Sequence, residues 1–370
     1  GKELDLIEEH YEANRYEQAF RHGQELFGPL TVWPDQVLAG KVATQVGGPR
    51  LGSALHLRAG RNEPHNASAQ FRAAIAVGRR FGPWDSYLYL QARKHLFSGN
   101  LSLKDSLGWL STQLEILCDF RDFQQARDTL QKIKGLASEN EWTLLSEASL
   151  LQAEDRRPEA LLLVEESLTA FPESRPFIQM KADLLETQGQ IDQAIEFLEC
   201  AQTRLHNCWL TAQLAQLLNS VERFEQALTQ YQRFKALQLL PDKDVAQWLD
   251  AGLFRCYYRL DRQEEALRHV GDKPGPALLA LLENLQKAGP EQKRRCLDLE
   301  YIRQNHSTCG PATVTSISMF WEKKIDHLEL ADEICYDGTT HSSLRNWAEK
   351  NGWVARELTL DWTTARALID

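Results

Sequence analysis

The residues best suited to chemistry lie near the end of the chain, around one cysteine. Residues 305–312 read Asn-His-Ser-Thr-Cys-Gly-Pro-Ala, which places Cys309 in the middle of a short polar turn. Apolar residues then recur at helical spacing, and Pro311 is well placed as the first residue of that helix. The pattern predicts that Cys309 lies on a turn at the N-terminus of a buried helix.

This position gives the Cys309 thiol the surroundings of a nucleophile. A helix N-terminus carries roughly half a positive charge, which favours the thiolate, the reactive form of cysteine. Gln304 lies upstream on the chain that leads into the same turn. Its side-chain amide and the backbone N–H of Cys309 are the donors that an oxyanion hole requires. Gly310 leaves room for a substrate backbone to approach.

The segment resembles the papain-clan cysteine peptidases that process bacteriocin leader peptides at double-glycine sites. The matching features are Gln304, the Cys-Gly-Pro-Ala run at 309–312, the apolar helix to Trp321, and the stretches 337–339 and 344–353. The resemblance implies that Cys309 is the nucleophile and Gln304 the oxyanion donor. It also implies a papain-like α+β domain with a strand at Arg356–Leu360. Residues 301–304 themselves resemble the end of a short strand or an extended entry into the turn.

The resemblance leaves the general base unassigned. The histidine of the family and its Asp or Asn partner correspond to positions beyond Asp370, where this chain ends. His306, His327 and His341 lie within the chain, but in papain-type sites the base comes from a separate strand across a cleft. Because a nucleophile needs an adjacent base, we expect the chain alone to be inactive as a peptidase, and whether it belongs to an enzyme stays open.

The N-terminal part of the chain is repetitive. Alanines recur at steps of 34, 34, 33 and 39 residues, at Ala126, Ala160, Ala194, Ala227 and Ala266. Residues four positions after and nine positions before each alanine are apolar, which places them on one helix face. Two helices fit in each repeat. Gly189 suits the turn between them, and Pro158 suits the start of the second helix.

This pattern resembles the tetratricopeptide repeat. The match is clearest over residues 108–270, and Asn14, Tyr16 and Ala19 match at the start, whereas residues 30–100 predict one or two degenerate repeats. The resemblance implies a right-handed superhelix of helix pairs whose concave groove binds a peptide or protein segment. A plain spacer is the alternative role of such an array.

These observations divide the chain into helical repeats at 1–288, a linker at 289–297, and the first half of a papain-like domain at 298–370. The predicted fold class is mainly α. The main hypothesis is a bacterial cysteine peptidase-like protein whose repeat array recruits a peptide or protein substrate. The alternatives are a non-catalytic interaction scaffold with an incomplete peptidase-like module, and an acyl or peptidyl transferase with the same nucleophile.

Composition narrows the classes of partner. The 42 basic and 52 acidic residues give a net charge of −10, which disfavours a nucleic-acid binder. No apolar run approaches the roughly 20 residues that span a membrane.

The seven cysteines form no C-x-x-C pair, which predicts free thiols in a reducing compartment, the cytoplasm. No metal or nucleotide motif is present, so no metal or cofactor is expected. The oligomeric state is left open.

Overall fold

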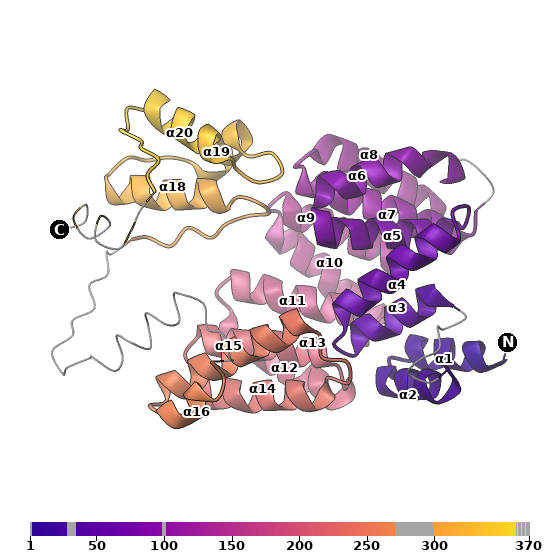
Figure 1. Ribbon diagram of the computed structural model, residues 1–370. Coiled ribbons are helices and arrows are strands. Elements are labelled where there is room, and N and C mark those ends of the chain that lie inside the picture. Colours follow the sequence, from indigo (N-terminus) through magenta and orange to yellow (C-terminus); the bar gives the residue numbers. More distant parts are fainter. Residues whose placement is uncertain are drawn as a thin grey trace. The chain divides into compact units, whose positions relative to one another are not determined.

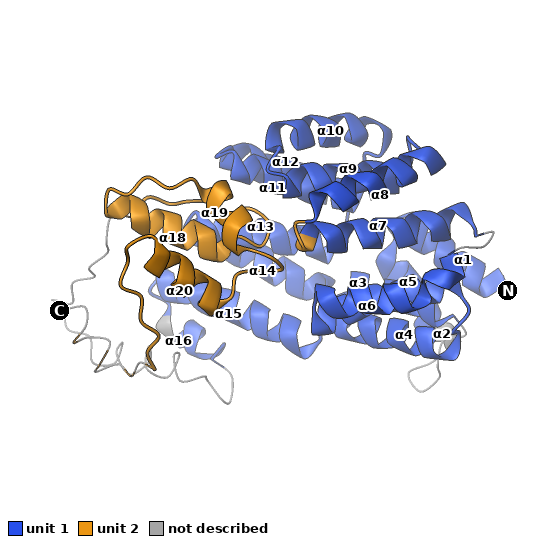
Figure 2. Cartoon of the chain, turned by 90° about the horizontal axis from the view of Figure 1, so that it is seen from above, with its two compact units in different colours: residues 1–118, 122–294 blue, residues 119–121, 295–370 orange. Residues whose placement is uncertain are grey.

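The structure is a computed structural model, drawn in Figure 1. It describes residues 2–27, 35–97, 101–270 and 299–359, together with three positions near the C-terminus, 361, 364 and 367. The chain divides into two compact units (Figure 2). The repeat unit comprises residues 1–118 and 122–294, and the C-terminal unit comprises residues 119–121 and 295–370. The predicted linker at 289–297 lies outside the described residues.

Within the described ranges every regular element is a helix. In chain order they are α1 (Lys2–Glu12), α2 (Tyr16–Phe27), α3 (Gln36–Gln45), α4 (Pro49–Asn62), α5 (Ala67–Phe81), α6 (Pro83–Arg93), η1 (Lys94–Phe97), α7 (Leu103–Asp119), α8 (Phe123–Leu136), α9 (Glu141–Ala153), α10 (Arg157–Ala170), α11 (Arg175–Thr187), α12 (Ile191–Arg204), α13 (Cys208–Ser220), α14 (Phe224–Leu237), α15 (Lys243–Arg259), α16 (Gln263–Leu267), α18 (Cys309–Phe320), α19 (His327–Ile334) and α20 (His341–Lys350).

The predicted repeat register is confirmed by the positions of the alanines. The fourth residue of α2, α8, α10, α12, α14 and α16 is Ala19, Ala126, Ala160, Ala194, Ala227 and Ala266, respectively. Each of these side chains is at most 3% exposed. A small side chain at this point lets the two helices of a pair approach closely. The repeat unit is therefore a tetratricopeptide-like array of helix pairs.

The turn inside each of these pairs is built in one way. Five positions before the alanine, the backbone is left-handed, with φ between 56° and 77°, at Asn14, Arg121, Asp155, Gly189, Glu222 and Asp261. In each turn the N–H of the next residue donates to a carbonyl of the first helix at 2.9 Å, as Gln190 does to Leu185. This bond satisfies a carbonyl that the helix end leaves free. The predicted role of Gly189 is confirmed.

Residues 36–93 form two further helix pairs without the repeated alanine, in agreement with the prediction of degenerate repeats. Helices α3 and α4 pack closely, α4 packs on α5, and α5 packs on α6. A Cβ atom at Gly40 would lie 2.4 Å from the His56 ring. Glycine therefore replaces alanine as the small residue that brings α3 and α4 together.

The repeat unit also contacts itself across a long stretch of sequence. The carbonyl of Val46, at the end of α3, accepts hydrogen bonds from the N–H groups of Leu239 and Leu240, each at 3.0 Å. The indole Nε1 of Trp209 on α13 donates to the carbonyl of Thr44 at 2.9 Å. These bonds join an early helix pair to a late one, so the curved array encloses its own concave side.

The C-terminal unit differs from the predicted α+β half-domain. Residues 301–304 and 356–359 carry no strand, and residue 360 of the second predicted strand lies outside the described ranges. Strand backbone groups need a partner strand for their hydrogen bonds, and the described residues contain none. The strand predicted at 356–360 is therefore wrong over its described residues, and at 301–304 the strand alternative is wrong. The regular elements of the unit, as described, are α18, α19 and α20.

Helix α18 forms where the sequence predicted it, but it buries a different face. Thr315 and Ser318 are 2% and 0% exposed, whereas Ile317, Phe320 and Trp321 are 40%, 39% and 63% exposed. The prediction of a helix buried through its apolar residues is wrong. The described part of the C-terminal unit has too few helices to cover both faces of α18.

Candidate functional site

The predicted nucleophile, Cys309, is the first residue of α18 and is exposed. Thr308 precedes it as the N-cap, yet its side chain makes no capping bond to the helix. Its Oγ1 instead accepts a hydrogen bond from the backbone N–H of Asn305 at 2.7 Å and lies 2.9 Å from Nε2 of His327. The turn before α18 is thus held by side-chain bonds of Thr308, and the thiol lies at the surface.

The other two predicted site residues lie on either side of this turn. Gln304 is exposed on the segment that enters the turn. Gly310 lies against Thr339, because a Cβ atom at position 310 would be 3.0 Å from the Thr339 Cβ. Packing against Thr339 is therefore a structural reason for glycine here. The roles of Gln304 as an oxyanion donor and of Gly310 as a substrate contact stay predictions.

The histidines of the C-terminal unit have other contacts. Nε2 of His306 lies 2.5 Å from Oδ1 of Asp119, which belongs to the same unit. His327 contacts the Thr308 hydroxyl, as above, and His341 is an exposed residue at the start of α20. These contacts join neither His306 nor His327 to the thiol of Cys309.

A second candidate site is a cavity of about 940 Å³ inside the repeat unit. Side chains from α1, α3, α4, α5, α7, α9 and α11 line it, which places it on the concave side of the array. Ligand-binding cavities in proteins commonly measure about 300–1,000 Å³. The cavity lies where the repeat pattern predicted a groove, and it is large enough to admit several side chains of a peptide.

Two basic side chains of this cavity, Lys41 and Arg72, are half-buried, whereas Arg79, which also lines the cavity without an ion pair to any described residue, is exposed. Neither Lys41 nor Arg72 forms an ion pair with any described residue, and the buried Nε of Arg72 has no hydrogen-bond partner. The guanidinium carbon of Arg72 lies 5.5 Å from the centre of the Trp142 ring and 5.0 Å from that of Phe71. Nζ of Lys41 lies 5.8 Å from the centre of the Tyr11 ring.

Burial has a clear electrostatic effect on both groups. Burial first, and then the charge of Arg72, lowers the pKa of Lys41 to about 8. Burial likewise lowers the pKa of Arg72 below its ordinary value. Both cations are therefore poorly solvated. The charge of Arg72 also repels Lys41, whereas Arg79 lowers the pKa of Arg72 and Glu115 opposes that shift. An anion between them would relieve both penalties.

Acidic side chains line other parts of the same cavity. They are Glu12, Glu115, Glu141 and Glu173. Lys104, also on the wall, lies 3.6 Å from Glu8 and 3.5 Å from Glu12. The wall is therefore mixed in charge. Its basic side chains without an ion pair among the described residues are Lys41, Arg72, Arg79 and Arg175.

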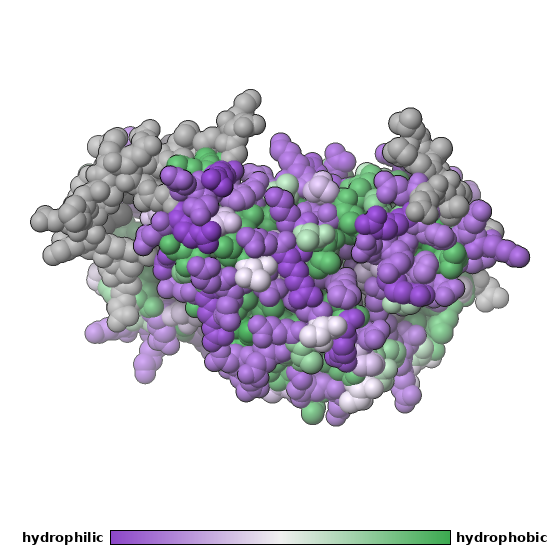
Figure 3. Space-filling model, turned by 90° about the horizontal axis from the view of Figure 1, so that it is seen from below, coloured by the Kyte–Doolittle hydropathy of each residue, from purple (hydrophilic) through white to green (hydrophobic). Residues whose placement is uncertain are grey.

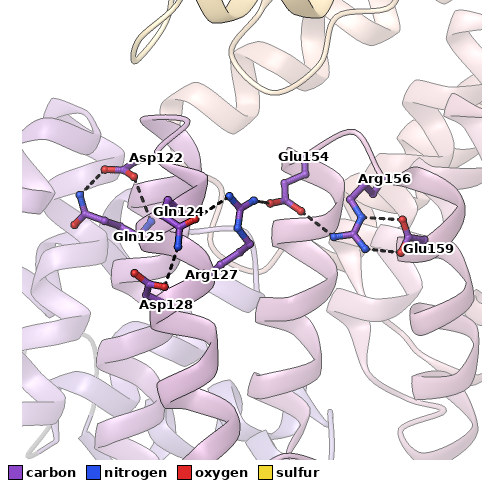
Figure 4. Close-up of polar contacts among 8 residues, drawn as sticks. All are labelled: Asp122, Gln124, Gln125, Arg127, Asp128, Glu154, Arg156 and Glu159. Atoms are coloured by element: carbon purple, nitrogen blue, oxygen red, sulfur yellow. Dashed lines mark hydrogen bonds and ion pairs between the residues drawn. The ribbon is translucent and has the colours of Figure 1, made fainter.

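The basic groups on the rim of the array differ from this pair, because they are paired. Arg127 and Arg156 both bond to Glu154, and Arg156 also bonds to Glu159, in a chain that crosses from α8 to α10 (Figure 4). The Arg156–Glu154 distance is 3.1 Å. This network joins neighbouring repeats, and its charges are mutually satisfied. We therefore assign it a structural role.

Sequence analysis did not single out Lys41, Arg72 or Trp142. Two of them lie in the degenerate region, where no repeat column marks the concave face. A signal was nevertheless present, because Arg72 stands in an alanine-rich helix whose neighbouring Ala69 and Ala76 are buried. An arginine on the buried face of a helix is unusual unless it has a partner.

Three further features concern a membrane, a metal ion and a protein partner. In the described ranges no helix has the length and apolar character that crossing a bilayer requires. In the same ranges no group of three or more His, Cys, Asp or Glu is placed to hold a metal ion. The face drawn in Figure 3 is mainly hydrophilic, with hydrophobic side chains interspersed. This face offers a partner mainly polar contacts.

No protein-family model matches the sequence, and no curated protein does. Solved structures match at low identity. A tetratricopeptide repeat protein from Parabacteroides merdae is 11% identical over 68% of this chain and 97% of its own, with a TM-score of 0.43. Yeast Tom70 is 17% identical over 74% of this chain and 58% of its own, with a TM-score of 0.47. PilF of Pseudomonas aeruginosa is 15% identical over 62% of this chain and 95% of its own, with a TM-score of 0.39. The repeat architecture of this chain rests on its own register of buried alanines and left-handed turns.

Proposed function

We propose that this chain is a protein-interaction scaffold whose repeat array holds a peptide or protein segment in its concave cavity. The observation that carries the proposal is the cavity of about 940 Å³ within an array that contacts itself. Its wall combines an aromatic side chain, Trp142, with charged groups from several helices. Such a wall suits a peptide, which offers both apolar and polar side chains.

The unneutralised cations favour binding over a spacer role. A spacer needs only stable packing, and a buried cation without a partner opposes stability. Lys41 and Arg72 are therefore costly in a spacer and useful in a binding site. The proposal also includes a reducing compartment such as the cytoplasm, which fits the free thiols of Cys200, Cys208, Cys256, Cys309 and Cys335.

A synthetic peptide microarray tests this function on the intact chain. Ser149 is a small, half-buried residue of the cavity wall, so Ser149→Trp fills the cavity. The control is Gln131→Trp, at an exposed position of α8 away from the cavity. We expect a set of peptides to bind the native chain and Gln131→Trp but not Ser149→Trp. Equal binding by all three proteins would overturn the proposal.

A second candidate function is the cysteine peptidase chemistry that the sequence suggested. The observation in its favour is the exposed Cys309 thiol at the first residue of a 12-residue helix. Alkylation by iodoacetamide, read out by peptide mass spectrometry, tests it, with the exposed Cys200 as an internal reference. Much faster alkylation of Cys309 than of Cys200 near pH 6 would support a nucleophile. Equal rates would leave the scaffold as the only function.

A further inference from the structure

Two of the basic side chains that line the cavity, Lys41 and Arg72, are half-buried and form no ion pair with any described residue. We propose that Lys41 and Arg72 form a subsite for the carboxylate of one acidic side chain, carried by a segment whose flanking residues are neutral or basic. This inference rests on the proposed function, because it specifies the chemistry of the segment that the cavity takes.

Arg72 supplies the directional part of the subsite. Its Nε is buried without a partner, and its guanidinium lies against the Phe71 and Trp142 rings while it lines the cavity. A guanidinium can donate two parallel hydrogen bonds to one carboxylate. The rings occupy an apolar side of the group, and its unused donor is the kind of group that a ligand completes. A carboxylate that enters the cavity supplies the missing acceptor.

Lys41 supplies a second positive charge from a different helix. It lies on α3, whereas Arg72 lies on α5, and both line the same cavity. The two are close enough for the charge of Arg72 to disfavour the protonated form of Lys41. One anion near both cations would change this repulsion into two attractions. Two helices contribute, so the subsite depends on the fold of the array.

The acidic side chains of the cavity favour a ligand with a single acid, although Arg79, Lys104 and Arg175 also line it. Glu12, Glu115, Glu141 and Glu173 line the same cavity. They would repel an oligonucleotide or a run of acidic residues, since many negative charges would then lie close to them. A lone carboxylate with neutral or basic neighbours meets Lys41 and Arg72 and avoids that repulsion. The charge pattern therefore favours one acidic side chain over a polyanion.

Matched peptide pairs test the inference. The microarray carries N-acetylated, C-amidated dodecapeptides with one Glu in a neutral or basic background, each beside a twin with Gln instead. All terminal charges are removed, so the Glu side chain is the only acid. We expect Glu peptides to bind the native chain at least tenfold more tightly than their Gln twins in solution titrations.

Variants of the cations give an independent measurement. Arg72→Met and Lys41→Met are each expected to reduce the Glu-over-Gln preference at least fivefold. Lys132→Met, which removes an exposed charge outside the cavity, should leave the preference unchanged. Circular dichroism establishes that each variant is folded. The peptide twins require no variant, so they decide the question even if a substitution unfolds the chain.

The outcomes separate this inference from the proposed function. Peptides that bind the native chain but not Ser149→Trp, with equal affinity for Glu and Gln twins, would overturn the carboxylate subsite and keep the scaffold. The carboxylate subsite would also be overturned if a single-stranded oligonucleotide displaced the Glu peptides at a lower concentration than a free Glu peptide does. If no peptide binds better to the native chain than to Ser149→Trp, both proposals are wrong.

Discussion

At the scale of single residues, the most informative feature is a contrast between paired and unpaired basic groups. Arg127 and Arg156 on the rim of the array have carboxylate partners. Lys41 and Arg72 in the cavity have none among the described residues, although burial makes a partner more valuable there. The difference indicates that rim charges serve the fold and cavity charges serve a ligand.

The first prediction concerns the stability cost of Lys41. Its pKa in the folded state is about 8 against an ordinary 10.5, so the folded state releases the proton at lower pH than the unfolded state. The free-energy penalty for holding a protonated Lys41 in the folded state is therefore complete below pH 8, and it is lost as the pH rises towards 10.5. Besides burial, Arg72 and Lys104 lower this pKa, whereas Glu8 and Asp35 oppose the shift.

We accordingly expect Lys41→Met to raise the free energy of unfolding at pH 7 by about 1–3 kcal/mol. The gain should shrink above pH 8 and vanish near pH 10.5. Urea unfolding of the native chain and the variant at pH 7 and pH 10 measures both values. Lys132→Met is the control and should show no such change with pH. A loss of stability in Lys41→Met at pH 7 would contradict the assignment.

The second prediction concerns Arg72. Arg72→Met removes a buried guanidinium with an unpartnered Nε and keeps an apolar side chain beside the Phe71 and Trp142 rings. The free energy of unfolding is expected to stay level or to rise by about 1 kcal/mol. Thermal unfolding at neutral pH measures it. A fall of several kcal/mol would mean that Arg72 is a structural residue, and the subsite would lose its main support.

At the scale of elements, the helix pairs are set by one small residue and one left-handed turn. Both signals are local, so the sequence predicts them well: the repeated alanine occurs at a constant place in each second helix, and Gly189 lies in the turn that the pattern assigned to it. The sequence predicted that the helix beside Cys309 starts at Pro311, and α18 starts two residues earlier, at Cys309. Local sequence thus predicts approximately where helices begin.

The same scale shows what local sequence does not predict. The face that α18 buries depends on which elements lie beside it, and no local pattern contains that information. The expected strand at 356–360 came from a resemblance to a family and had no partner strand to pair with among the described residues. A strand is a property of a pair, whereas a helix satisfies most of its own hydrogen bonds.

The third prediction tests the turn geometry. Gly189 has φ of 77° and open space around its missing Cβ, so Gly189→Ala changes only backbone strain. We expect it to lower the free energy of unfolding by about 1–2 kcal/mol. The reverse change, Asp261→Gly at the equivalent turn with φ of 56°, should raise it by up to about 1 kcal/mol. Urea denaturation compares the two. Effects of the same sign would show that the two turns are not equivalent.

At the scale of the whole repeat unit, the array is closed by contacts between distant helix pairs. Trp209 donates to the carbonyl of Thr44, and Val46 accepts from Leu239 and Leu240. No sequence pattern predicts these contacts, because they depend on the curvature that many helix pairs accumulate. The cavity, with Arg72 in its wall, results from the same curvature. The repeat pattern therefore predicts that a groove exists but does not predict which side chains line it.

The fourth prediction belongs to this closure. Trp209→Phe removes the indole N–H but keeps an aromatic ring, so the bond to the Thr44 carbonyl is lost. The free energy of unfolding should fall by about 0.5–1.5 kcal/mol. Peptide binding in the cavity should weaken as well, because the array encloses the cavity less firmly. Trp321→Phe, at a side chain that is 63% exposed, is the matched control for urea denaturation. Identical behaviour of the two variants would mean that the bond does not support the closure.

A calorimetric titration of the intact chain with the best acidic peptide from the microarray determines whether the cavity is the binding site. The account predicts a saturable, single-site isotherm for the native chain and for Gln131→Trp. It predicts no detectable heat of binding for Ser149→Trp, in which the cavity is filled. A Ser149→Trp protein that remains folded and binds the peptide as tightly as the native chain would place the ligand elsewhere and contradict the account.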